Sequence, residues 1–153
     1  MTGRSIVVVS WATLALFVVT IVPDASGGHA FDGVASGVAL TLFLVSLPIW
    51  LYAFGLAVVR SARGDEIGVG SLFFLRGSAP SDVRRRLLGA LVLSLVVAGA
   101  TAWANAFAVL EPMLPMALGG RWGARHGTFP SRDLAVRVPA NTRRTTAPNG
   151  GGR

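Results

Sequence analysis

Residues 34–59 read VASGVALTLFLVSLPIWLYAFGLAVV, and none of these 26 side chains is charged. A helix of this length extends about 39 Å, because each residue adds about 1.5 Å along the axis. The hydrocarbon core of a bilayer is about 30 Å thick and needs about 20 apolar residues. Arg60 and Arg63 follow the stretch directly. It therefore predicts a transmembrane helix with a basic flank at its end.

Two more uncharged stretches lie on either side of it. Residues 87–110 form a run of 24 that follows three arginines at 84–86, and residues 5–22 form a run of 18 that follows Arg4. The apolar part of a cleaved signal peptide is usually about 7–15 residues long. We therefore expect the first run to stay as a membrane anchor, while cleavage would remove one helix. The pattern predicts an all-α integral membrane protein with three transmembrane helices.

The composition points to the same class. Hydrophobic residues make up 52% of the chain and charged residues 14%, whereas a typical soluble chain has about 25% charged residues. Mean hydropathy is +0.61. The 153 residues include no cysteine, which excludes disulfides, thiolate nucleophiles and cysteine-bound metals. These values argue against a water-soluble enzyme.

The basic residues are unusual in kind. All 14 are arginine, and against seven acidic residues they give a net charge of +7. The absence of lysine beside abundant Ala, Gly and Val indicates a GC-rich genome, and hence a bacterium. A basic chain can bind nucleic acid, but arginines at the ends of membrane helices explain the charge as well. We expect the lipid bilayer as a partner and no nucleic acid.

The connectors differ sharply in charge. Residues 23–33 contain two aspartates and no arginine, whereas residues 60–86 contain six arginines. Because cytoplasmic loops carry an excess of arginine, the second connector and the N-terminus are predicted in the cytoplasm. Three crossings then place the C-terminus outside, although seven further arginines beyond position 120 oppose this orientation. The predicted units are a bundle over residues 1–120 and a disordered basic tail over residues 121–153, whose composition buries little apolar surface.

Small residues recur every fourth position in the third stretch. Such a pattern lets helix backbones approach closely, either within one chain or in a homo-oligomer. The predicted helix-packing face consists of Ser94, Ala98, Ala102 and Ala106. Gly33 and Gly37 form a weaker pattern of the same kind.

Polar residues inside the apolar stretches are candidates for function, since polar groups in a membrane are costly. Thr101 and Asn105 lie one helical turn apart, which predicts a polar contact between helices. The alternative for this pair is a direct contact with a substrate. Glu111 follows the third stretch, where we expect a solvated boundary residue. The alternative is a coupling carboxylate of a transporter, although such groups lie nearer the bilayer midplane.

Catalytic patterns are missing from the sequence. It has no nucleophile elbow and no phosphate-binding loop, and His29 and His126 lack a metal-ligand spacing. We therefore expect no enzyme activity, no cofactor and no metal. The favoured function is a non-catalytic accessory or scaffold subunit in the bacterial cell membrane. It would bind another membrane protein or form a homo-oligomer. The alternative is a small oligomeric transporter or pore, including a holin-like protein.

Overall fold

The structure is a computed structural model that describes residues 3–27 and 32–131. The elements of these residues, in chain order, are α1 (Gly3–Ala25), α2 (Asp32–Ala62), α3 (Val69–Phe73), α4 (Ser81–Thr101), the 3₁₀-helix η2 (Ala106–Leu110) and α5 (Met113–His126). Extended pairing in the described part of the chain is limited to one isolated bridge between Asp65 and Ser131. The predicted all-α class is confirmed.

Helices α1 and α2 are long and apolar enough to cross a membrane. Only 28% of the apolar window of α1 and 22% of that of α2 are buried inside the bundle. Helix α1 ends one turn beyond the predicted limit, at Ala25, and is followed by Gly27 in a left-handed conformation. Helix α2 continues through Pro48 to Ala62 and is followed by Gly64 in the same conformation. Glycine suits these two positions because it has no Cβ to clash.

Helix α4 is shorter than predicted. The third apolar stretch was expected to stay helical to residue 110, but α4 ends at Thr101. Asn105 is extended, with φ −141° and ψ 107°, and its side-chain oxygen accepts a hydrogen bond from the Phe107 amide at 3.0 Å. Asparagine is among the best N-cap residues, so it begins a new helix here. The expectation of three spans is therefore not confirmed.

The chain after Asn105 turns back along the bundle as η2 and α5. Residues from 121 onward were assigned to a disordered tail, but α5 is helical from Met113 to His126. The prediction is therefore wrong for residues 121–126. Pro112 is its N-cap and Pro115 lies in its first turn, where backbone N–H groups have no helical partner and proline is tolerated. Residues 132–153 of the expected tail lie outside the described part of the chain.

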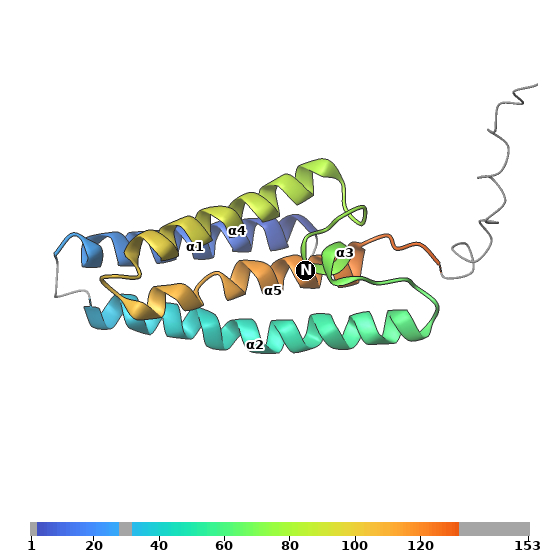
Figure 1. The fold of residues 1–153 in the computed structure, drawn as a ribbon, viewed down its shortest axis with the longest axis horizontal. Coiled ribbons are helices and arrows are strands. Elements are labelled where there is room, and N and C mark those ends of the chain that lie inside the picture. Colours follow the sequence, from blue (N-terminus) through green and yellow to red (C-terminus); the bar gives the residue numbers. More distant parts are fainter. Residues whose placement is uncertain (1–2, 28–31, 132–153) are drawn as a thin grey trace, which may run out of the picture.

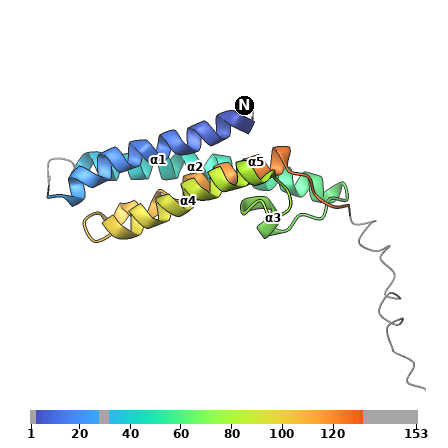
Figure 2. The same ribbon diagram turned by 90° about the horizontal axis from the view of Figure 1, so that it is seen from above.

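Helix α5 occupies the middle of the bundle. It packs against α1, α2, α3 and α4. Figure 1 shows α1 and α4 on one side of it and α2 on the other, and Figure 2 shows the same set of helices from above. Its buried residues include the large side chains Leu114, Leu118 and Trp122. The core of the molecule therefore forms around the returning segment.

Small residues of α5 allow α3 to approach it closely. A Cβ added at Gly120 would collide with the Phe73 ring, and one added at Gly123 would collide with the Leu72 carbonyl oxygen. On its other side, Phe73 stacks on Trp50 of α2 with ring centroids 4.5 Å apart. The connector between α2 and α4 therefore packs against α2 and α5.

Arg60, at the end of α2, holds the end of α5. Its Nη1 donates to the carbonyl oxygens of Ala124 and Gly127, each at 3.0 Å, and its Nε donates to Asp65 at 2.7 Å. The guanidinium also lies 4.7 Å from the centre of the Phe129 ring. Cations stabilise helix C-termini because the last carbonyl groups have no helical donors.

Both ends of the described chain lie at the same end of the bundle. Gly3 adjoins Trp122 of α5. The backbone before Ser131 pairs with the α2–α3 connector, since the Glu66 amide donates to the Pro130 carbonyl at 2.8 Å. The sequence predicted a cytoplasmic N-terminus and an external C-terminus, and this fold does not support that separation.

The α3–α5 contact gives a prediction about stability. We expect Gly123→Ala to lower the free energy of unfolding by about 1–3 kcal/mol, because the added methyl group meets backbone that cannot easily move. Gly99→Ala is the matched control, since Gly99 is a helical glycine of α4 with open space around it. The control should be neutral or raise stability by up to about 1 kcal/mol. The unfolding free energies of both purified variants are measured in mild detergent. If Gly123→Ala and Gly99→Ala changed stability equally, the close α3–α5 packing would be contradicted.

Candidate functional site: buried polar groups

Asn105 joins three segments at the end of the bundle that carries no described arginine. Its Nδ2 donates to Asp24 at the end of α1, at 3.1 Å, and to Ser36 near the start of α2, at 2.9 Å. Its oxygen caps η2 through the Phe107 amide. Asn105 and Asp24 are 6% and 5% exposed. This Asn105 cluster (Asp24, Ser36, Asn105) ties together segments up to 81 residues apart in the sequence.

Sequence reasoning identified Asn105 as a polar contact but placed it incorrectly. It was expected on the same helix as Thr101, whereas it lies beyond the end of α4. Thr101 is also buried, and its hydroxyl donates to the Val97 carbonyl within its own helix. The pair therefore forms no joint site. The sequence did contain a local signal for this break. Asparagine is a strong N-cap residue, so an asparagine after a long apolar run can mark the start of a new helix.

Glu111 is the second buried polar group. It lies between η2 and α5, is fully buried, and accepts a hydrogen bond from the Ser94 hydroxyl of α4. Its other oxygen, Oε1, has no hydrogen-bond partner among the described residues. The expectation of a solvated boundary residue is therefore wrong. The chain turns back at Asn105 and carries Glu111 into the interior, which its place in the sequence does not reveal.

The predicted packing face is divided between two elements. Ser94 and Ala98 are buried on α4, where Ser94 meets Glu111. Ala102 is the C-cap of α4 and is partly exposed, and Ala106 begins η2 and is exposed. The four residues therefore do not line one continuous helix face.

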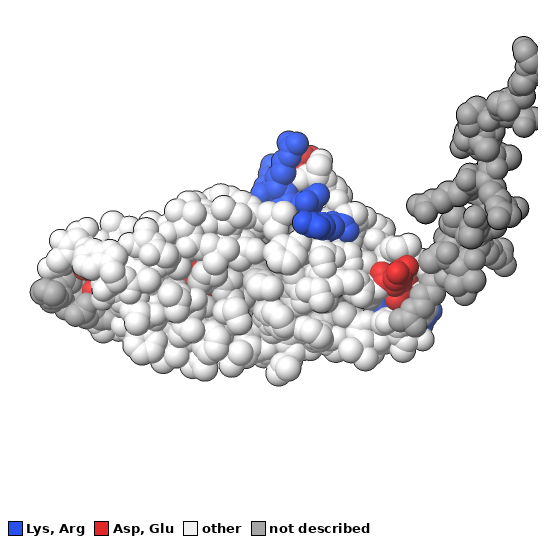
Figure 3. Space-filling model, in the orientation of Figure 1, with Lys and Arg blue, Asp and Glu red and all other residues white. Residues whose placement is uncertain are grey.

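Charge is strongly segregated along the bundle. The described arginines all come from the first two turns of α1 and α4, the last two turns of α2 and α5, or the connector between α2 and α4. They are Arg4, Arg60, Arg63, Arg76, Arg84, Arg85, Arg86, Arg121 and Arg125. Figure 3 shows basic side chains confined to one half of the visible face. We call this the arginine end, and the opposite end holds the Asn105 cluster.

The chemistry of these groups is limited. Within residues 3–27 and 32–131, no three His, Asp or Glu side chains are grouped so that they could hold a metal ion. Glu111 with Ser94 pairs a carboxyl group with a hydroxyl group, and no His among the described residues joins them. His29 lies outside the described residues. What this arrangement offers is hydrogen bonding between segments and two buried carboxyl oxygens without a partner among the described residues, Asp24 Oδ1 and Glu111 Oε1.

Comparisons with known proteins identify no relative. No family model, no curated protein and no solved structure matches the chain. Function must therefore be argued from the residues themselves.

The Asn105 cluster gives a second prediction. We expect Asn105→Asp to lower the free energy of unfolding by about 2 kcal/mol, because the hydrogen bond to Asp24 is lost and a second carboxyl group faces Asp24 in a buried position. Asp24→Asn should cost less, since the new amide oxygen can still accept from Asn105. The double variant Asp24→Asn/Asn105→Asp restores a donor opposite an acceptor. We expect the double variant to recover at least half of the unfolding free energy that Asn105→Asp loses, measured by unfolding in detergent. If the effects of the two single substitutions instead simply added up, direct contact between the two side chains would be contradicted.

Proposed function

We propose that the chain is a non-catalytic, multi-pass protein of the bacterial cell membrane that serves as an accessory or scaffold subunit. The apolar exterior of its long helices supports the membrane location. Large aliphatic side chains are exposed along α1, α2 and α4, among them Val8, Val19, Leu51, Val58 and Val96. Exposed apolar surface on this scale needs lipid or protein to cover it.

In this proposal α1 and α2 cross the bilayer, and residues 87–120 form a hairpin beside them. The uncharged part of α4, residues 87–101, is about 22 Å long. Trp103 at the tip of the hairpin is 78% exposed. Tryptophan is enriched at membrane–water interfaces, so the tip suits the interface opposite the arginine end. The bundle then has four helical passes in place of the three first expected.

The arginines support an orientation. Because cytoplasmic segments carry an excess of arginine, the arginine end faces the cytoplasm. Gly3 and Ser131 then lie on the same side. This arrangement removes the conflict in the sequence, where basic residues beyond position 120 opposed an external tail.

The observation that carries the scaffold role is an open face on α2. Gly33, Gly37 and Gly55 are exposed, and a Cβ added at any of them would meet no atom within 4 Å. Gly37 and Gly55 are 18 residues apart, which is five full turns, so they share one face. Small residues let another helix approach closely in lipid. This α2 face suits a transmembrane helix of a partner subunit, either a second copy of the chain or another membrane protein.

The scaffold role predicts that Gly37→Leu disrupts assembly. The larger side chain keeps a partner helix at a distance and removes its dispersion contacts. We expect the share of the protein in larger complexes, measured by native gel after mild solubilisation, to fall about tenfold, which corresponds to about 1.4 kcal/mol. Gly99→Leu adds the same side chain at an equally open glycine of α4 and should leave assembly intact. Equal complexes for wild type and both variants would contradict the proposal.

A small oligomeric transporter or pore is the second candidate, and buried Glu111 is the observation that favours it. Ionisable residues inside membrane bundles often line ion or proton pathways. Glu111→Gln keeps the size of the side chain and an oxygen that can accept from Ser94. A scaffold should therefore keep its complexes and its cellular phenotype in this variant. Loss of the phenotype with intact complexes would favour transport.

A further inference from the structure

We propose that the groove between α1 and α4 at the arginine end binds one anionic phospholipid of the surrounding leaflet. The phosphate would lie between Arg4, Arg86 and the indole N–H of Trp122, with an acyl chain along Val7, Val8 and Trp11. This inference requires the membrane location proposed above but not the partner on α2.

Two adjoining cavities form the groove. The first has a volume of about 620 Å³ and is lined by Gly3, Arg4, Val7, Val8, Asp82, Val83, Arg86 and Trp122. The second, of about 600 Å³, shares Val7, Val8 and Arg86 with the first and adds Trp11 and Ala12. The axes of α1 and α4 diverge toward this end in Figure 2. Basic groups thus lie beside apolar side chains of α1, an arrangement that matches a lipid headgroup and its chain.

An unpartnered donor lies in the first cavity. The Trp122 side chain is 6% exposed, and its Nε1 has no hydrogen-bond partner in the described part of the chain. Gly3 also lines this cavity, and a Cβ added to it would lie 2.9 Å from this nitrogen. A buried N–H without an acceptor costs free energy. Because this nitrogen is buried beside Gly3, an oxygen of the lipid reaches it only if the first turn of α1 shifts, and that oxygen would then supply the missing acceptor.

The charges around the cavity also suit a phosphate. The guanidinium groups of Arg4 and Arg86 form no ion pair or hydrogen bond with other described residues and are therefore available. Asp82 also lines the cavity and opposes an anion, which leaves one net positive charge among the three. Arginine binds phosphate through short, charge-assisted hydrogen bonds. Basic pockets between membrane helices on the cytoplasmic side are typical sites for anionic lipids.

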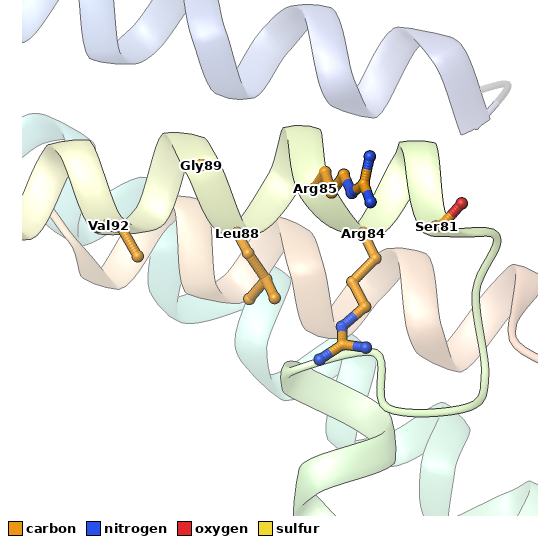
Figure 4. Close-up of a pocket in the computed structure, with 6 residues that line it drawn as sticks. All are labelled: Ser81, Arg84, Arg85, Leu88, Gly89 and Val92. Atoms are coloured by element: carbon orange, nitrogen blue, oxygen red, sulfur yellow. The ribbon is translucent and has the colours of Figure 1, made fainter.

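A different face of α4 provides a control. A cavity of about 580 Å³ is lined there by Ser81, Arg84, Arg85, Leu88, Gly89 and Val92 (Figure 4). It has two arginines but none of the residues of α1 or α5. Arg85 and Arg86 are neighbours with the same charge, yet only Arg86 lines the groove. Comparing them separates a defined site from general attraction of a basic surface to anionic lipid.

The test measures lipid binding to the full chain in detergent. Phosphatidylglycerol is titrated, and binding is followed by the rise in melting temperature and by native mass spectrometry. We expect a preference for phosphatidylglycerol over phosphatidylcholine, and about tenfold weaker binding of phosphatidylglycerol for Arg86→Gln and for Trp122→Phe. Arg85→Gln should change the affinity less than about twofold. Asp82→Asn should strengthen binding, since it removes a repelling charge.

Several results would overturn the site. They are equal weakening by Arg85→Gln and Arg86→Gln, unchanged binding for Trp122→Phe, and no preference over phosphatidylcholine. Glycerol phosphate is a further arm of the test, because binding as tight as that of the lipid would show a soluble anion site instead. Arg4→Gln is a second variant for the case that Trp122→Phe does not fold, because Arg4 is exposed. We expect it to weaken binding of phosphatidylglycerol about tenfold as well. The α2 proposal is tested separately by the size of the complexes that Gly37→Leu forms. A negative result in the lipid-binding test would therefore not contradict it.

Discussion

Helix α5 contacts α1, α2, α3 and α4, and the rest of the structure depends on that central place. The helix can lie there because glycines at 120 and 123 let the α3 backbone and the Phe73 ring approach. Its start tolerates prolines at 112 and 115, since the first turn needs no amide donors. Its end is held by Arg60. These features turn an apparently irregular, basic segment into the core of the fold.

Polar contacts fasten the two ends of the bundle in different ways. At the arginine end, one guanidinium satisfies carbonyl groups of α5 and pairs with Asp65. At the other end, Asn105 holds the ends of α1, α2 and α4 together through Asp24 and Ser36. Side chains between the ends are mainly aliphatic, with Ser94 and Glu111 as a buried polar pair. A bundle fixed at both ends, with an apolar exterior, suits a static membrane scaffold that presents helix faces to partners and lipids.

The sequence predicted the features that depend on hydropathy alone. Long uncharged stretches gave the apolar helices α1 and α2. The arginines beyond position 120 were predicted on the opposite side from those of residues 60–86, so the single arginine end was not predicted. The sequence did not predict the return of the chain, because a break after Thr101 depends on the cap made by Asn105 and on packing against α1 and α2. For the same reason Glu111 was misplaced: its burial follows from a turn six residues earlier. The Arg60 contacts join residues 64 and 67 positions apart, and no local pattern reveals such pairs.

Labelling of single cysteines in intact cells tests the returning helix most directly, and the natural chain contains no cysteine to interfere. Ser26, Ser81 and Thr128 are exposed positions near the Asn105 cluster, at the start of α4 and after α5. A membrane-impermeant maleimide should give the same result for Thr128→Cys and Ser81→Cys, because both lie at the arginine end. It should give the opposite result for Ser26→Cys, whichever end faces the cytoplasm. With the arginine end inside, only Ser26→Cys reacts before permeabilisation. If Thr128→Cys instead behaved like Ser26→Cys, the chain would leave the membrane on the far side, and the buried return of α5 would be contradicted.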